Sequence, residues 1–308
     1  MVPRMAGGGV VNDPLDSVHG PIHTVVCTDT NPYGTWQTEF LEHSWVRSAM
    51  PGELIRLVGA AEDEPLPVHP TARVIRTSAT NRHPDLDGDY TPINRLLSLA
   101  EWLDQHRPVG TVLIVDCDMV FRAPIERRAL VGHPIGQHWW DFSWANGGSW
   151  AQVADDLSPT TIGARQSVTW PLLIHTYDLR RVIGRWIELT VAIRTATGAW
   201  ESDMVALPMV LAEHGLNCDL EMLAAWMNWP DEVVGDAPVI HYCQPVLDID
   251  DNDIWYKQAY QPWSAIGVDP SKAALSYCRD LLTMLDKFAA LRRRVTRLRP
   301  VEPTGPSE

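Results

Sequence analysis

The feature that most constrains the fold is an apolar segment ending in two acidic residues, TVLIVDCDMVFRAPI at 111–125. Its first five residues are β-branched or apolar and uncharged, which predicts a strand buried on both faces of a mostly parallel sheet. Asp116 and Asp118 follow on either side of Cys117. Residues i and i+2 of an extended chain point to the same side, so both carboxylates are expected to face one cation just outside the sheet.

Two enzyme classes place Asp-x-Asp after such a strand: nucleotide-sugar glycosyltransferases of the GT-A type, and phosphatases whose first Asp is the nucleophile. Ligands of open α/β sheets gather at the carboxyl ends of strands. Oxygen ligands with space for phosphate oxygens suit Mn²⁺ or Mg²⁺. The expected ligand of such a cation is a diphosphate. A solvated pair without function is the third interpretation, although two carboxylates flanked by apolar segments are costly without a cation.

Composition narrows the class of protein. The 308 residues are enough for one large α/β domain, and the net charge of −14 argues against a nucleic-acid partner. Five cysteines, odd in number and widely spaced, indicate reduced thiols of a cytoplasmic protein. The first twenty residues contain no apolar stretch long enough for a signal peptide or a membrane span, which predicts a flexible arm.

The first half of the chain predicts a β-α-β opening. Strands are expected at 22–27 and 53–58, on either side of a helix over 36–50, which favours a parallel sheet with right-handed crossovers. A further helix begins at 91–92, with Asn94 and Arg95 in its first turn. Helix N-termini attract phosphate and an Arg adds a charged fork, while a solvated first turn is the alternative.

The second half contains a late strand over 238–243 that carries His241. A lone His among apolar residues is either a core residue or a ligand, and the pattern alone favours the core. The chain also has fourteen tryptophans, several of them close together at Trp139, Trp140 and Trp144. Stacking against sugar rings is one use of such a cluster; a loop packed by its own aromatic residues is the other interpretation.

The segment after residue 271 predicts a long helix with two apolar stripes. One stripe contains Leu275, Cys278, Leu282, Leu285 and Ala289, and the other contains Leu281, Met284, Phe288, Leu291 and Val295. Two stripes indicate a helix covered on two sides, either by the domain alone or also by a second subunit in a homo-oligomer. The basic end is expected to be solvated: Arg292, Arg293, Arg294, Arg297 and Arg299.

The order of these segments, with their motifs, resembles the hydroxyproline O-arabinosyltransferase and peptidyl serine α-galactosyltransferase group, retaining enzymes of the GT-A fold. The resemblance covers the chain from about 23 to 260. It is carried by IHTVVCTDTNPYGTWQTEFLEHSWVRSAMPGELIRLV, TPINRLLSLAEWL, VDCDMVFRAPI, AWESDMVAL and VIHYC. It implies an α/β fold, a GT-A (Rossmann-like) mostly parallel sheet flanked by helices. The implied organisation is an arm over 1–20, a GT-A domain over 21–265, and a C-terminal helix with a basic, disordered tail over 266–308.

The same resemblance assigns roles to individual residues. Asp116, Asp118 and His241 would hold Mn²⁺ or Mg²⁺. The donor, a UDP-sugar, would be bound by Thr28, Asn94, Arg95 and Cys117, with Thr28 facing the base. Asp203 would be the catalytic residue that stabilises the cationic sugar or orients the acceptor. Arg95 stands where the group has Lys, and Asp203 stands where it has Glu.

The implied reaction is metal-assisted transfer of a sugar to a hydroxyl acceptor, a hydroxylated peptide or a small metabolite, with retention of configuration. Trp139, Trp140 and Trp144 are the candidate acceptor contacts. A phosphatase would need a later Lys and a second acidic pair at strand ends. The chain has no Lys between Asp118 and Lys257, and Asp155-Asp156 follows no apolar strand. A non-catalytic sugar-binding protein, the other rival, would need neither Asp118 nor His241.

Overall fold

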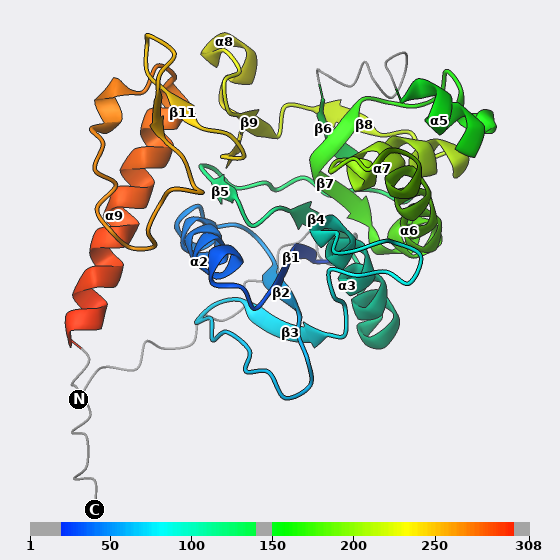
Figure 1. The fold of residues 1–308 in the computed structure, drawn as a ribbon, viewed down its shortest axis with the longest axis horizontal. Helices are drawn as coiled ribbons and strands as arrows, with labels where there is room; N and C mark the ends of the chain where they lie inside the picture. Colours follow the sequence, from blue (N-terminus) through cyan, green and yellow to red (C-terminus); the bar gives the residue numbers. More distant parts are fainter. Residues whose placement is uncertain (1–19, 140–149, 299–308) are drawn as a thin grey trace, which may run out of the picture.

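The computed structural model describes residues 20–139 and 150–298, so most of the predicted arm and the tail beyond residue 298 lie outside the described part. A large sheet is built from β1 (Ile22–Asp29), β2 (Glu53–Gly59), β3 (Arg73–Thr77), β4 (Thr111–Val115), β6 (Ile135–His138), β7 (Val168–His175) and β8 (Asp219–Glu221). Its strand order is β3-β2-β1-β4-β7-β6-β8. Strands β3, β2, β1 and β4 are parallel, and β7 is antiparallel to both β4 and β6. The predicted mostly parallel α/β sheet is therefore confirmed (Figure 1).

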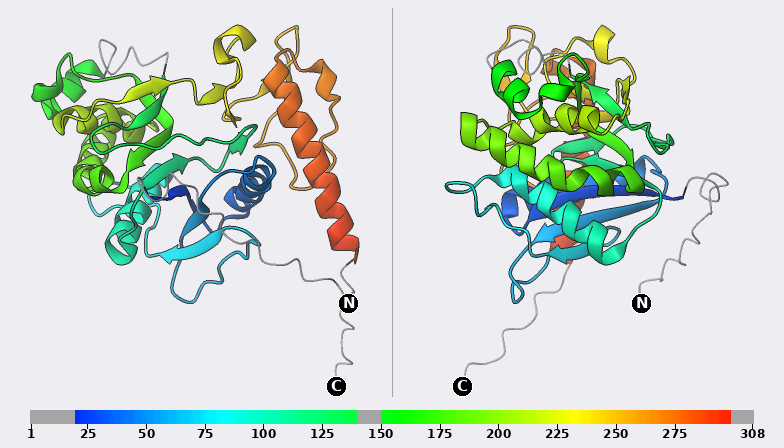
Figure 2. Two further views of the ribbon diagram at one scale, coloured as in Figure 1. Left: turned by 180° about the vertical axis from the view of Figure 1, so that it is seen from behind. Right: turned by 90° about the vertical axis from the view of Figure 1, so that its right-hand side faces the viewer.

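Helices lie on both faces of this sheet. The principal ones are α2 (Pro32–Arg47), α3 (Thr91–His106), α6 (Thr176–Thr197) and α7 (Ser202–Glu213), with the short α5 (Ala151–Leu157) and α8 (Asp231–Val234). The crossover through α2 leads from β1 outward to β2, and the crossover through α3 leads from β3 back to β4. Because both are expected to be right-handed, α2 and α3 cover opposite faces. Figure 2 shows α3, α6 and α7 beside one another.

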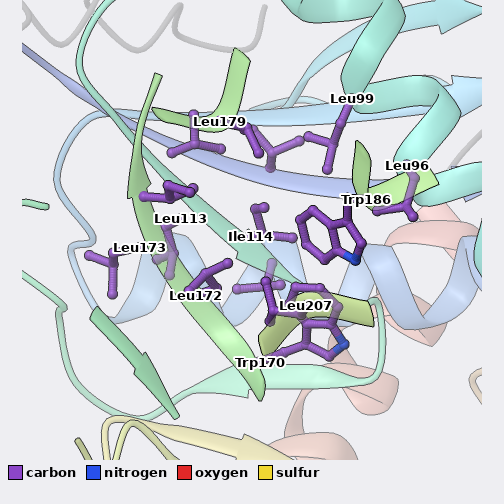
Figure 3. Packing of buried hydrophobic residues seen from close by; sticks show 14 of the residues in the cluster. Leu96, Leu99, Leu113, Ile114, Trp170, Leu172, Leu173, Leu179, Trp186 and Leu207 are labelled. Atoms are coloured by element: carbon purple, nitrogen blue, oxygen red, sulfur yellow. The ribbon is translucent and has the colours of Figure 1, made fainter. Parts of the chain in front are cut away.

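The main core lies between the sheet and the layer of α3, α6 and α7. All five residues of β4 are buried, as expected for a strand covered on both faces. Figure 3 shows Leu113 and Ile114 of β4 packed among Leu96, Leu99, Leu172, Leu173, Leu179 and Leu207, with Trp170 and Trp186 beside them. This packing fixes the end of β4, where the two aspartates begin.

A small second sheet lies next to that end. It consists of β5 (Met119–Phe121), β10 (Val239–His241) and β9 (Ala224–Trp226), in the order β5-β10-β9. Strand β10 is antiparallel to β5, and the register places His241 opposite Met119. Since Met119 directly follows Asp118, the late strand brings His241 to the acidic pair.

The last part of the chain forms a hairpin, β11 (Val246–Leu247) with β12 (Asp253–Trp255), and the long helix α9 (Ser276–Leu298). Leu281, Met284 and Phe288 of the second stripe are buried within the chain, whereas Leu291 and Val295 are 47% and 44% exposed. Most of this stripe is thus covered without a second subunit, and the oligomer stays a prediction. No helix in the described part of the chain combines the length and apolar character needed to cross a membrane.

The expectation that the basic end of α9 is solvated is wrong for two residues. Arg292 forms an ion pair with Glu39 of α2 at 2.9 Å and lies 5.2 Å from the ring centre of Trp263. Arg293 donates a hydrogen bond to the carbonyl of Trp263 at 2.7 Å. The segment around Trp263 folds over the helix, which a periodicity pattern does not reveal. Arg294 is exposed as predicted, and the side chains of Arg297 and Arg299 lie outside the described residues.

Candidate functional site

The acidic pair lies where β1 and β4 end side by side. The two strands are parallel, with Val26 opposite Val115, so residues after each strand emerge at the same edge. Gly59, at the end of β2, lets helix α3 approach this edge closely. A Cβ at this position would lie 2.2 Å from the carbonyl oxygen of Ala79 and 2.8 Å from Nδ2 of Asn94. The first turn of α3 therefore reaches the carboxyl ends of the strands.

Asp118 is held by two side chains from late in the chain. Nε2 of His241 lies 3.2 Å from Oδ1 of Asp118 and 3.7 Å from Oδ2 of Asp116. The ammonium of Lys257 forms an ion pair with Oδ2 of Asp118. Burial by itself would raise the pKa of Asp118, but the charges and hydrogen bonds of His241 and Lys257 hold it well below its usual range.

Asp116 is held by Arg95 of α3. One guanidinium nitrogen of Arg95 contacts Oδ1 of Asp116, and the other donates to Oδ2 of Asp203 at 2.9 Å. The guanidinium also lies 4.5 Å from the ring centre of Trp170. Burial alone would lower the pKa of Arg95, but the two carboxylates hold it above its usual range. The guanidinium is therefore a fixed charge that joins α3, the end of β4 and the start of α7.

Asp203 is buried in the first turn of α7. Nε1 of Trp186 donates to the carbonyl of Asp203 at 2.9 Å, and the hydroxyl of Tyr90 lies 3.5 Å from its carboxylate. Burial raises the pKa of Asp203 to about 6, against the opposing charge of Arg95. A carboxylate that changes charge near neutral pH beside a second acidic residue is typical of a functional site.

Asp116, Asp118 and His241 fit a divalent cation. Each offers one ligand atom, and these atoms lie within 4.8 Å of one another. Nδ1 of His241 is buried and has no hydrogen-bond partner in the described part of the chain. No hydrogen bond there therefore prevents the tautomer that carries its proton on Nδ1 and binds a metal through Nε2. Two carboxylate oxygens with one imidazole nitrogen suit Mn²⁺ better than a set of oxygens alone.

The other predicted donor contacts lie at the same edge of the sheet. Oγ1 of Thr28 accepts a hydrogen bond from the buried Arg56 at 2.8 Å, which fixes the end of β1. Asn94 is buried and accepts a hydrogen bond from Ser98 at 2.8 Å. Cys117 is a free thiol, and burial with the flanking carboxylates raises its pKa to about 12. Donor binding by Thr28, Asn94, Arg95 and Cys117 stays a prediction.

The tryptophan cluster is described only in part. Trp139 is 7% exposed and lies 6.2 Å from Trp226, ring centre to ring centre. Trp140 and Trp144 lie outside the described residues, so their proposed contact with an acceptor stays a prediction.

Sequence reasoning missed Lys257, together with Trp170 and Trp186, which support Arg95 and Asp203. Trp170 and Trp186 stack at 5.4 Å in the core, and nothing in their sequence context separates them from ordinary core residues. One feature of the sequence could have pointed to Lys257: it is the first of only three lysines in the chain.

Lys257 is also the later lysine that a phosphatase would require, but it contacts Asp118, not the first carboxylate of the pair. The second acidic pair is not at a strand end: Asp155 lies in α5 and forms an ion pair with Arg165 at 2.9 Å. The geometry therefore disfavours the phosphatase.

Comparison with known proteins gives a relative for most of the chain. No protein-family model matches it. The chain is 27% identical over 257 residues to the peptidyl serine α-galactosyltransferase of Arabidopsis thaliana. The match covers 74% of this chain and 31% of the relative, so the chain spans about a third of that relative's length.

Solved structures show the same fold. The apo structure of the bifunctional glycosyltransferase WbbM matches 88% of this chain and 51% of its own, with a TM-score of 0.53 and 11% identity. An active-site mutant of LgtC matches 91% of this chain and 98% of its own, with a TM-score of 0.50 and 13% identity. The predicted resemblance and the GT-A fold are confirmed, and the matches support the broader prediction of a glycosyltransferase enzyme.

Proposed function

We propose that the protein transfers a sugar from a nucleotide-diphosphate sugar, a UDP-sugar, to a hydroxyl acceptor, with a divalent cation and with retention of anomeric configuration. The observation that carries the proposal is the cluster of Asp116, Asp118 and His241 at the end of β4, next to the buried pair of Arg95 and Asp203. Open α/β sheets bind ligands at this place. The likeness to a peptidyl serine α-galactosyltransferase supports a sugar as the transferred group.

The cation, Mn²⁺ or Mg²⁺, would be held by Asp116, Asp118 and His241, and when bound it would supply positive charge for the departing diphosphate. Lys257 is poised to help, because its flexible ammonium can turn from Asp118 to a phosphate oxygen. The buried carboxylate of Asp203 would then stabilise the positive charge that develops on the sugar. Arg95 keeps that carboxylate in position.

In the transfer, the bond between the anomeric carbon and the diphosphate oxygen breaks, and the acceptor oxygen forms the new bond. The hydroxyl proton passes to the departing phosphate oxygen. Retention in one step requires the acceptor to approach from the side of the leaving group, so no separate protein base is required. The relative's name makes UDP-galactose the first donor to test and a serine-containing peptide the first acceptor.

The test is a hydrolysis screen of nucleotide sugars with Mn²⁺, because transferases slowly hydrolyse their own donor. Release of free sugar and UDP from one donor, abolished by excess chelator, is the expected result. Full activity in excess chelator, with no metal found in the protein, would show that the reaction does not require a metal. Binding of a nucleotide sugar without turnover, in the presence of an acceptor panel, would favour the non-catalytic sugar-binding protein.

A further inference from the structure

A buried arginine lies beside the carboxyl end of β1. Arg56 belongs to β2, and the parallel register places it opposite Val26 of β1. Its side chain has no exposure to solvent. A buried charge is costly unless other groups satisfy it, so the partners of this guanidinium show what it holds in place.

The guanidinium binds three groups of the segment that connects β1 to α2. Its Nε donates to Oγ1 of Thr28 at 2.8 Å. A second nitrogen, Nη2, donates to the carbonyl of Asp29 at 3.2 Å and to Oγ1 of Thr35, near the start of α2, at 3.2 Å. One rigid planar group therefore joins the last two residues of β1 to the helix that follows.

The turn between β1 and α2 also has hydrogen bonds of its own. The carboxylate of Asp29 accepts from the backbone N–H of Asn31 at 2.9 Å, and the side chain of Asn31 accepts from the backbone N–H of Tyr33 at 2.9 Å. Each of these bonds spans two residues, so they set the shape of the turn and not its position against the sheet. Arg56 fixes that position, because it contacts the turn from the neighbouring strand β2.

Two further side chains orient the guanidinium. Nη1 of Arg56 contacts Nε2 of His69, and Nδ1 of His69 contacts one carboxylate oxygen of Glu42 in α2. Guanidinium nitrogens only donate, so Nε2 of His69 accepts and Nδ1 carries the proton that is donated to Glu42. The other oxygen of Glu42 accepts from the backbone N–H groups of Thr71 and Ala72 at 2.6 and 3.0 Å. We call these three side chains the buried row Glu42–His69–Arg56; each is at most 9% exposed.

Both ends of the buried row are charged. Burial lowers the pKa of Arg56 to about 10, which leaves the guanidinium protonated at neutral pH. Burial alone would raise the pKa of Glu42, but the hydrogen bonds from His69 and from two backbone N–H groups hold it below its usual range. Apolar residues of similar volume stabilise a fold as well as a buried ion pair does. The directed hydrogen bonds of Arg56 are therefore better explained by the placement of the turn than by stability.

The turn lies next to the place expected for the diphosphate. A cation at Asp116 and Asp118 would put the diphosphate at the end of β4, and β1 is a parallel neighbour of β4. The neighbour on the other side, β7, is antiparallel, and its carboxyl end at His175 lies beside Thr111 at the start of β4. Since ligands gather at the carboxyl ends of strands, a nucleoside attached to the diphosphate would lie over β1 and β2.

We propose that Arg56, oriented by His69 and Glu42, is a positioning residue that holds the turn over 28–35 in place for the nucleoside of the donor. Arg56 is fully buried, so it acts through the turn and does not touch the donor. This inference rests on the proposed transfer from a nucleotide sugar and adds a residue that determines how tightly the nucleoside is bound. Phosphate binding, which depends on the cation, should not depend on Arg56.

The test compares the binding of UDP and of inorganic pyrophosphate by calorimetry, each with saturating Mn²⁺. Arg56→Lys keeps the positive charge, but an ammonium cannot replace the planar fork. UDP affinity should therefore fall roughly 5- to 20-fold, while pyrophosphate affinity stays within about two-fold. KM for donor hydrolysis should rise by a similar factor with kcat nearly unchanged. Equal loss of both ligands, or no loss of either, would overturn the inference.

A second variant keeps the test valid if Arg56→Lys does not fold. Arg56→Met combined with Glu42→Gln removes both buried charges together, which a fold tolerates better than the loss of one partner. Its folded protein should show the same selective loss of UDP affinity, and unchanged UDP affinity would overturn the inference.

The role of the buried row is tested at its centre. His69→Leu breaks the row, whereas the amide in His69→Gln can still accept from Arg56 and donate to Glu42. UDP affinity should fall in the first variant and stay within about three-fold of the wild type in the second. Equal UDP affinity of the two variants would show that His69 does not orient Arg56.

Arg165→Lys is the matched control. Arg165 is another buried arginine, which donates to Thr161 at 2.8 Å and to the carbonyls of Ala154 and Ser158 at 3.0 and 3.1 Å, around α5. Its variant should lower the melting temperature and leave both affinities unchanged. The same outcome for Arg56→Lys would make Arg56 a core residue only. If the wild type binds no nucleotide with Mn²⁺, the proposed function itself fails, which is a different result.

Discussion

The candidate site has two sides that neutralise its acidic pair in different ways. The helix side consists of Asp116, Arg95 and Asp203, and the late-strand side consists of Asp118, His241 and Lys257. On the helix side one planar guanidinium joins two carboxylates and lies on an indole, so its position is fixed from three directions. On the late-strand side an imidazole and a flexible ammonium share one carboxylate.

This difference indicates which charged side chains have fixed positions and which a bound cation can replace. Arg95 is held by two elements besides its own helix, and moving it would leave the buried Asp203 without its counter-ion. Within the described residues Lys257 forms an ion pair with Asp118 alone, and its stem is long and flexible, so a divalent cation can replace it on Asp118. The helix side should therefore set the sugar and its charge, while the late-strand side responds to metal and diphosphate.

The largest effect is expected from Asp118→Asn. The variant loses a metal ligand and the carboxylate that contacts both His241 and Lys257, so donor hydrolysis should fall by at least ~100-fold, comparable to loss of a principal electrostatic group. Asp250→Asn, at an exposed aspartate in the β11–β12 turn, is the matched control. Rates of UDP release at saturating Mn²⁺ measure both, and hydrolysis within ten-fold of the wild type would remove Asp118 from the site.

His241→Ala comes next and decides between a ligand and a core histidine. As a ligand, its loss should weaken Mn²⁺ and UDP binding together by at least ~10-fold while the protein stays folded. As a core residue, its loss would cost roughly 1–3 kcal/mol of stability and leave affinity nearly unchanged. Calorimetric titration and a melting curve on one preparation measure both quantities. Unchanged metal affinity with a lower melting temperature would exclude the ligand.

The pKa of Asp203 predicts opposite pH trends for activity and stability. Its carboxylate should lose its proton near pH 6, so donor hydrolysis that needs the charge should fall roughly ten-fold for each pH unit below that value. The pKa of Asp203 in the folded protein lies above the ordinary value of 3.8, so folding favours the protonated form. Asp203 therefore stabilises the protein most at low pH and loses that contribution as pH rises through about 6.

The Asp203→Asn variant is the reference for both pH trends, because an Asn side chain does not titrate. The stability of the wild type relative to this variant should decrease between about pH 4 and pH 7, by on the order of 3 kcal/mol at most. Denaturant titrations across that range measure it. A relative stability that instead rises with pH would mean that the charge of Arg95 outweighs burial at this carboxylate.

The sequence predicted the strand end and the two aspartates of the site better than the side chains that contact those aspartates. Strand β4 has the predicted bounds because its five residues are uncharged and suit a strand buried on both faces. The two aspartates come directly after it, so their place at the strand end was predicted too. His241 joins the site through the antiparallel pairing of β10 with β5, which a local pattern weighted toward the core could not show. Only the family resemblance pointed to the ligand.

Two further features depend on contacts between distant segments. Lys257 reaches Asp118 across 139 residues from a stretch without periodicity, so neither strand nor helix patterns place it. Arg95 was expected to meet phosphate, and that contact stays a prediction; Arg95 lies between two carboxylates because α7 brings Asp203 to the same turn of α3. Helix position was predictable from the sequence, but the direction of one long side chain depends on a partner 108 residues away.

The smallest effect sharpens the comparison most, because Lys257→Met should change two affinities in opposite directions. Without the ammonium, Mn²⁺ no longer displaces an ion pair from Asp118, so its affinity in the absence of nucleotide should increase roughly 3- to 10-fold. The affinity for UDP with saturating Mn²⁺ should decrease by a similar factor, since the diphosphate loses a cation. Lys272→Met, at an exposed lysine outside the site, should change neither. Calorimetry measures both affinities, and a loss of both would show that Lys257 is a fixed part of the frame, as Arg95 is on the helix side.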